Sequence, residues 1–244
     1  MTLLPLSWMV NLWLINRFSL PSGSQVDGQK VMLGFEQTAT ENAKVCSQFL
    51  QRLVERGLSY QQGLLFVIDG AKGLRKAIED VFGDYAEVQR CQWHKRENVV
   101  AYLAKSEQKR FRSMLQQAYE QPTYNKAKQA LSNIRTELKL LNESAVRSLD
   151  EGLEETLTLH RLGVFQELGI SLKTTNCLES INSQVARLTG RITYWKNSNQ
   201  RHRWVASALL EIEKGLKKVK GYRHLPMLRK ALQRELKIQD IMAA

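Results

Sequence analysis

An uninterrupted apolar run at 64–68 is followed directly by Asp69 and Gly70. A short run rich in branched and aromatic side chains is typical of a strand buried on both faces. Apolar positions at three- and four-residue steps then predict a helix over 71–82, and 86–91 predicts a second strand. In open α/β sheets the chemistry lies at the carboxyl ends of parallel strands, so Asp69 is a candidate active-site residue. A cap for the following helix is the alternative interpretation of Asp69.

The pattern upstream of this stretch also alternates strand and helix. Asp27-Gly28 is typical of a two-residue hairpin turn, with 31–35 as the second strand of the hairpin. Periodic apolar positions predict a helix over 41–56. The resulting order of strand, helix, strand, helix and strand is typical of an α/β fold, and we assign 26–94 to the first part of its core.

Residues 1–25 fit this pattern poorly. The segment is apolar overall, but proline, asparagine and arginine interrupt it too often for a membrane span. Its first basic residue is Arg17, so it lacks the basic start of a signal peptide. We interpret it as an atypical segment and expect no membrane partner.

The pattern changes to helix alone after the second predicted strand. Residues 95–168 hold one proline and recurring apolar positions at helical spacing, which predicts an all-helical insertion. The string TTN at 174–176 then offers N-cap side chains for a helix, with Glu179 beside its apolar stripe. We expect 169–244 to consist of C-terminal helices that complete the core.

Basic residues concentrate near the carboxyl end of the chain. The 244 residues carry a net charge of +12, and the sequence pI is about 9.7. Fourteen Lys and Arg residues stand against three Glu residues in 187–237, with tyrosine and tryptophan among them. Basic side chains neutralise phosphates and aromatic rings stack on bases, so this pattern favours DNA as the partner. The candidate DNA-binding residues are Arg187, Arg191, Arg201, Arg203, Lys217 and Lys218.

The alternative for this region is an amphipathic helix at 203–219, with its aromatic side chains in the core and its basic side chains in solvent. Both interpretations can hold together. The three cysteines are an odd number without a Cys-x-x-Cys spacing, which argues against a disulfide framework and indicates a reducing compartment, the cytoplasm.

The chain resembles the mutator-type transposases of bacterial insertion sequences in four strings. These are LGFEQTATEN at 33–42, FVIDGAKGLRKAI at 66–78, QRCQWHKRENV at 89–99 and TTNCLESIN at 174–182. Each string is a weak signal alone, but their order and spacing are specific. The resemblance covers about 26–235.

This resemblance implies an RNase H-like core and metal-dependent cleavage and transfer of DNA strands. The family uses an Asp-Asp-Glu carboxylate set, in which its second Asp corresponds to Asp69 and its Glu to Glu179. The family's helical insertion corresponds to 95–168. Hard divalent cations prefer carboxylate oxygens, so the implied cofactor is Mg²⁺ or Mn²⁺. Two such ions hold the attacking and leaving oxygens of a phosphodiester in line.

The resemblance also implies further residues around the active site. A Cys-x-x-His pair of the family corresponds to Cys91 and His94, and we place both in the active-site vicinity with Gly70 and Asn176. Cys91 and His94 alone are too few for a structural zinc site, which takes four ligands. An intact family member is expected to act as a homo-oligomer on transposon ends and target DNA.

The sequence departs from the family at its beginning. No Asp or Glu lies upstream of Asp27, so the family's first catalytic Asp has no counterpart, and 1–25 does not resemble the family's first strand. We therefore expect an incomplete RNase H-like core in an N-terminally truncated, inactive copy of a transposase. A second hypothesis is a non-catalytic DNA-binding remnant that interferes with intact transposase. A third is another RNase H-like nuclease, such as a junction resolvase, against which the strings at 89–99 and 174–182 argue.

Overall fold

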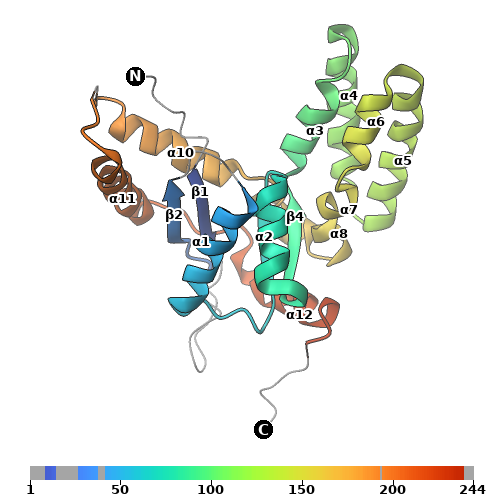
Figure 1. Cartoon of the computed structure of the whole chain (residues 1–244). Helices are drawn as coiled ribbons and strands as arrows, with labels where there is room; N and C mark the ends of the chain where they lie inside the picture. The colour runs from blue at the N-terminus through green and yellow to red at the C-terminus, as the bar shows by residue number, and fades with distance from the viewer. Residues whose placement is uncertain (1–8, 15–26, 38–41, 193, 239–244) are drawn as a thin grey trace.

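Two pairs of strands form the β-structure of this α/β chain (Figure 1). The computed structural model describes residues 9–14, 27–37, 42–192 and 194–238. In the first pair, β1 (Met9–Leu14) lies antiparallel to β2 (Val31–Gln37), and in the second, β3 (Leu64–Ile68) lies parallel to β4 (Ala86–Arg90). Within the described residues these pairs are two separate two-stranded sheets.

The strand β1 was not predicted. It lies inside the segment 1–25 that we interpreted as atypical, and its backbone pairs with β2 from Met9 opposite Gln37 to Leu14 opposite Val31. The hairpin arm expected just before Asp27 lies outside the described residues. The string MVNLWL suits a strand, but polar residues and prolines on either side obscured that signal, and its partner β2 lies far along the chain.

The predicted strand, helix and strand around Asp69 are confirmed. Alternate side chains of β3 are buried beneath α1 (Ala43–Glu55) and α2 (Lys72–Phe82), which pack against each other. Its other side chains, Leu65 and Val67, pack against the apolar cluster of α9 and α12. The strand is thus covered on both faces, as its unbroken apolar run predicts.

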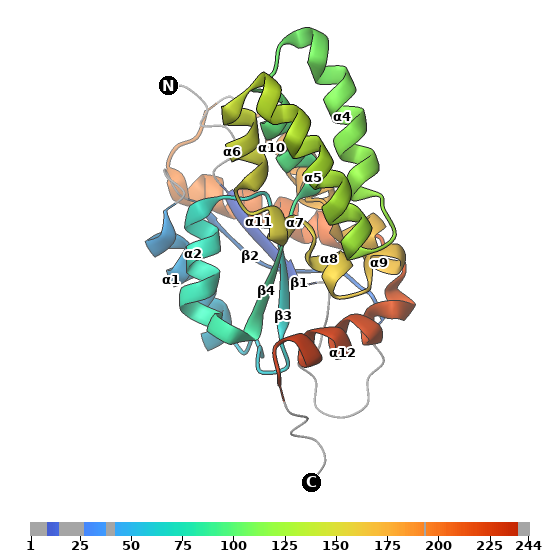
Figure 2. The ribbon, with the colours of Figure 1, turned by 90° about the vertical axis from the view of Figure 1, so that its right-hand side faces the viewer.

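Residues 95–168 are helical, as expected, although the first helix already starts at Gln92. Figures 1 and 2 show the larger helices of this insertion projecting together away from the strands. They enclose an apolar core of their own. The helices from here to the end of this block are α3 (Gln92–Val100), α4 (Lys105–Tyr119), α5 (Tyr124–Leu141), α6 (Glu143–Asp150), α7 (Leu153–Thr156), α8 (Thr158–Arg161) and α9 (Phe165–Leu172).

The remaining described residues form helices that return to the strands. α10 (Asn176–Thr189) and α11 (Ser198–Lys214) pack against each other, and α11 also contacts β2. After the short turn Tyr222–His224, α12 (Leu225–Glu235) packs beside α9. No helix in the described part of the chain is both long and apolar enough to cross a membrane.

Candidate active site and DNA-binding surface

Asp69 is the first residue after β3 and is exposed. Its Oδ1 accepts a hydrogen bond from the backbone N–H of Ala71 at 3.1 Å. Ala71, not Asp69, is the N-cap residue of α2, and no side chain caps that position. The carboxylate therefore stabilises the turn before the helix, and its position at the strand end is the one expected of an active-site acid.

Glu179 lies in the first turn of α10, about 110 positions away from Asp69 in sequence. Its carboxylate is half exposed, and its Oε1 lies 3.7 Å from Nε2 of His94. The same oxygen accepts a hydrogen bond from Oγ1 of Thr175 at 3.2 Å. The fold thus brings three of the predicted strings, those at 66–78, 89–99 and 174–182, together around His94.

The polypeptide backbone holds these strings together. The N–H of Cys91 donates to the carbonyl of Ile68 at 2.7 Å, which continues the parallel ladder beyond β4. The next N–H, that of Gln92, donates to the carbonyl of Lys173 at 2.9 Å. These two bonds fix the start of α3 between the end of β3 and the start of α10.

Both predicted catalytic carboxylates act on His94. The pKa of His94 is raised from the ordinary value, most strongly by its hydrogen bond with Cys91; burial opposes the shift, and the charges of Asp69 and Glu179 add to it. Glu179 lies 3.7 Å from the imidazole, and Asp69 follows Ile68, whose carbonyl accepts from the N–H of Cys91 three positions before His94.

Cys91 and Thr175 complete the cluster from the buried side. Burial alone would raise the pKa of the Cys91 thiol, but hydrogen bonds from His94 and Thr175 outweigh it and lower the pKa. Both the N–H and the Oγ1–H of Thr175 lie 3.4 Å from the Cys91 sulfur, and Thr175 Oγ1 lies 3.2 Å from Nδ1 of His94. We predicted Thr175 as an N-cap side chain; it occupies that position, but its hydroxyl makes no cap hydrogen bond and serves this cluster instead.

Two buried basic residues, which the sequence analysis missed, hold the end of β4 and the start of α3 against the end of α6. Lys95 Nζ donates to the carbonyl of Ser148 at 2.6 Å and to that of Glu151, and burial lowers the pKa of Lys95 to about 8. Arg90 Nη1 donates to the same Glu151 carbonyl at 3.1 Å. For Arg90 the available signal was a basic residue at the end of a buried strand, where it needs a partner; Lys95, in α3, had no such signal.

Arg90 also packs against the turn after Asp69. Gly70 has φ +108°, and a Cβ built there would lie 2.2 Å from Nε of Arg90. Only a glycine allows the guanidinium and the turn to approach this closely. Gly70 is therefore a packing residue of the turn after β3, next to the candidate acid Asp69.

The predicted neighbours do not all join the cluster. Asn176 is exposed at the start of α10, and among the described residues it has no hydrogen bond to Asp69 or Glu179. The described residues also hold no group of three or more His, Cys, Asp or Glu side chains that could bind a metal ion. Asp69 and Glu179 have the carboxylates that Mg²⁺ prefers, but this pair alone does not make a complete site.

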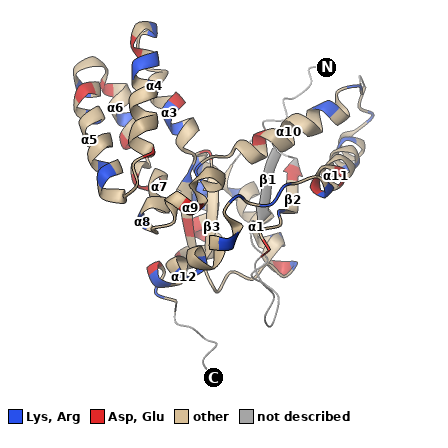
Figure 3. Cartoon of the chain, turned by 180° about the vertical axis from the view of Figure 1, so that it is seen from behind, with Lys and Arg blue, Asp and Glu red and all other residues tan. Residues whose placement is uncertain are grey.

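The predicted DNA-binding residues lie along α10, the connection that follows it and α11, with Lys217 and Lys218 just beyond α11. All are exposed except Arg201, which is half-buried. Figure 3 shows Lys and Arg at the far end of α10 and along the connection to α11. None of the ion pairs among the described residues includes one of the six; by contrast, the insertion's Arg110 and Arg135 are paired with Glu137 and Asp150.

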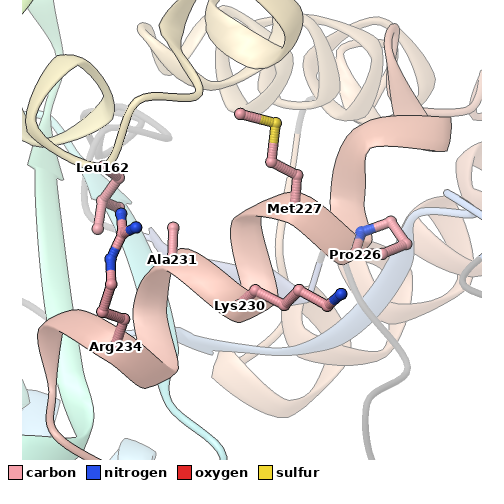
Figure 4. Close-up of a pocket in the computed structure, with 6 residues that line it drawn as sticks. All are labelled: Leu162, Pro226, Met227, Lys230, Ala231 and Arg234. Atoms are coloured by element: carbon pink, nitrogen blue, oxygen red, sulfur yellow. The ribbon is translucent and has the colours of Figure 1, made fainter.

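A separate pocket of about 540 Å³ lies where α12 faces the end of α8 (Figure 4). Its lining residues are Leu162, Pro226, Met227, Lys230, Ala231 and Arg234. None of them belongs to the cluster around His94, so this pocket plays no part in the candidate active site.

Comparison with known proteins identifies relatives of one kind. A sequence profile described as "Transposase, Mutator family" matches residues 17–218. The transposase for insertion sequence element IS905 of Lactococcus lactis is 28% identical over 185 residues, which are 76% of this chain and 46% of that protein. The transposase for IS256 in transposon Tn4001 of Staphylococcus aureus is 28% identical over 193 residues, 78% of this chain and 48% of that protein. The chain thus spans about half the length of the curated relatives it matches.

Proposed function

Since the chain belongs to the Mutator family of transposases, we propose that it takes part in DNA transposition, as a portion of a transposase that binds DNA and carries two active-site carboxylates. The observation that carries this proposal is the 3.7 Å approach of Glu179 Oε1 to His94 Nε2, in a segment whose backbone is hydrogen-bonded to Ile68, the residue before Asp69. The fold thus brings the end of β3 and the start of α10, which lie far apart in sequence, to the same segment. The family relationship is the reason for proposing DNA strand cleavage and transfer as the chemistry of that site.

We propose further that the strands and their covering helices belong to an RNase H-like core. In support, an acid follows the buried strand β3, a helical insertion follows β4, and a second acid lies on a later helix. In that arrangement Asp69 and Glu179 would hold Mg²⁺ or Mn²⁺, and the ion would supply polarisation of the phosphodiester.

The residues around the two acids have positioning roles in this proposal. Thr175 donates to Glu179 and lies within hydrogen-bond distance of His94, so it limits the orientations of the carboxylate. When protonated, His94 would place a positive charge 3.7 Å from the Glu179 carboxylate. The unpaired cations of α10 and α11 attract the phosphate backbone.

We expect the 244-residue chain by itself neither to cleave nor to join transposon ends. Two-metal transfer needs enough negative ligands to hold both ions beside DNA phosphates, and Asp69 and Glu179 supply only two. The test is incubation of the purified chain with end-containing DNA in Mg²⁺ or Mn²⁺, with Asp69→Ala as control. An extended chain that supplies an upstream strand ending in Asp should gain activity, and Asp69→Ala or Glu179→Ala should remove it. Cleavage by the unextended chain that vanishes in Asp69→Ala would show that another residue completes the site.

A non-catalytic DNA-binding protein is the second candidate. The unpaired cations of α10 and α11 favour it, because they lie outside the ion pairs of the described residues, unlike Arg110 and Arg135, and can bind DNA phosphates without a metal ion. This candidate predicts DNA binding without cleavage even after the upstream strand is supplied. It also predicts interference with intact transposase through oligomers that contain both chains. Activity of the extended chain would exclude it.

A further inference from the structure

The tip formed by the end of α10, the connection and the start of α11 carries an exposed tyrosine. The side chain of Tyr194 is 73% exposed and makes no ring contact with another described residue. We name as the α10–α11 tip the exposed residues Arg187, Arg191, Tyr194, Lys196, Arg203 and Trp204. A large ring left in water beside cations is the kind of surface that takes an anionic, aromatic ligand.

The charge around this ring is of one sign. Between residues 180 and 210 there are five Lys and Arg side chains and no Asp or Glu. None of these cations forms an ion pair within the described residues. The tip therefore presents uncompensated positive charge on both sides of Tyr194.

The structure separates the aromatic residues of the basic region by their surroundings. Tyr222 is partly buried against the α9–α12 cluster, and the cations of Lys218 and Arg223 lie 5.2 and 6.0 Å from its ring centre. Trp195 is only partly exposed, whereas Trp204 is 48% exposed. Tyr194 and Trp204 are thus the rings of this region that remain open to a ligand.

Hydrogen bonds give the segment after Tyr194 a defined conformation. Asn197 caps α11, its Oδ1 accepting from the N–H of Gln200 at 2.8 Å. The Gln200 side chain in turn accepts from the backbone N–H of Lys196 at 2.7 Å. In the next turn His202 stacks on Phe35 of β2, with ring centres 4.5 Å apart. These contacts hold the start of α11 against the strands. The segment therefore loses less conformational entropy when a ligand binds.

We propose that the α10–α11 tip binds DNA at an unpaired base, with Tyr194 stacking on the base and the flanking cations contacting phosphates. This inference rests on the DNA binding proposed above and adds the class of DNA. In a regular duplex each base face is covered by its neighbours, so a protein ring can stack only where a base is unpaired or terminal. Base–aromatic stacking tolerates every base, so the preference is for DNA structure and not for sequence.

The experiment compares three fluorescently labelled DNA probes by anisotropy at one salt concentration: a blunt duplex, the same duplex with an unpaired bubble, and the single strand. We expect the chain to bind the two probes with unpaired bases more tightly than the duplex. Tyr194→Ala should weaken their binding roughly tenfold and leave duplex binding unchanged. Tyr194→Phe should keep the preference, because phenylalanine stacks without the hydroxyl.

Tyr102→Ala is the matched control, since Tyr102 is a comparably exposed tyrosine (52%) of the insertion. It should leave all three affinities unchanged. Equal binding of duplex and bubble by the unmodified chain would overturn the inference and leave the proposed DNA binding intact. An unchanged preference in Tyr194→Ala would do the same. Absence of binding to every probe would overturn both.

Discussion

At the scale of single residues, the candidate site depends on one buried hydroxyl and one imidazole. Thr175 has a single hydroxyl proton and lies near Cys91, His94 and Glu179. It can accept from His94 and donate to one of the other two at a time. The hydroxyl therefore couples the orientation of the candidate acid Glu179 to the state of the buried Cys91–His94 pair.

The raised pKa of His94 makes the stability of the fold depend on pH. A group whose pKa is higher in the folded than in the unfolded state stabilises the fold below its unfolded pKa, and this contribution is lost as the pH rises through the folded pKa. We expect His94→Gln to lower the free energy of unfolding more at about pH 5.5 than at about pH 9. Urea unfolding at the two pH values measures the difference.

His160 provides a control of opposite sign. Burial lowers its pKa to about 4, so protonation of the unfolded chain destabilises the fold as the pH falls below the ordinary value of 6.5. The loss of stability in His160→Gln should therefore be smaller in acid than at neutral pH. The same pH trend in both variants would contradict the assignment of His94 as the raised group.

At the scale of elements, the insertion and the turn after Asp69 meet through Arg90. Its guanidinium donates to the Glu151 carbonyl at the end of α6 and packs against Gly70 after β3. Because Arg90 is buried and held at Glu151, it has little room to move aside. The turn that carries Asp69 is thereby packed against the anchor of the insertion.

Because of this packing, we expect the methyl group added by Gly70→Ala to lower the free energy of unfolding strongly. Gly57→Ala is the matched control, since Gly57 has φ +98° but no atom within 4 Å of the place where a Cβ would lie, so only backbone strain of about 1 kcal/mol is expected. Gly70→Ala adds the clash with Arg90 and should cost about 2 kcal/mol more. Urea unfolding of both variants tests this. Equal losses of stability would show that Arg90 moves aside freely.

At the scale of the whole molecule, positive charge is divided into paired and unpaired sets. Many cations of the insertion and of α2 face carboxylates, whereas those of α10, α11 and the segment just after it lie outside the ion pairs of the described residues, apart from Lys214 with Glu211. An ion-paired cation releases few counterions on binding DNA, because its charge is already balanced. The unpaired set should therefore dominate binding.

The salt dependence of DNA affinity measures this division. Replacing Arg201, Arg203, Lys217 and Lys218 together by alanine should make the slope of log affinity against log salt concentration less steep. The slope should fall in magnitude by up to about 0.9 for each replaced residue that contacts a phosphate. Replacing the paired Arg110 and Arg135 should leave the slope nearly unchanged. An unchanged slope in the first variant, with a flatter one in the second, would place the DNA on the insertion.

The sequence by itself determined the elements whose signal is local. The apolar run of β3, the helical periods of α2 and the insertion, and the TTN string before α10 each depend on neighbouring residues, so they were predicted close to their observed positions. The candidate acids Asp69 and Glu179 were also named from strings alone. Side-chain periodicity reports which face of an element is buried, and this information is present before folding.

The tertiary structure decided what depends on partners distant in sequence. It paired β1 with β2 and placed the Thr175 hydroxyl within hydrogen-bond distance of Cys91 instead of in a helix cap. It also buried Arg90 and Lys95 against carbonyls of the insertion. It also determined which cations are paired and that Tyr194 is exposed while Tyr222 is packed. Hydrogen bonds, burial and ion pairing are properties of contacts, and a contact between distant residues exists only once the chain has folded.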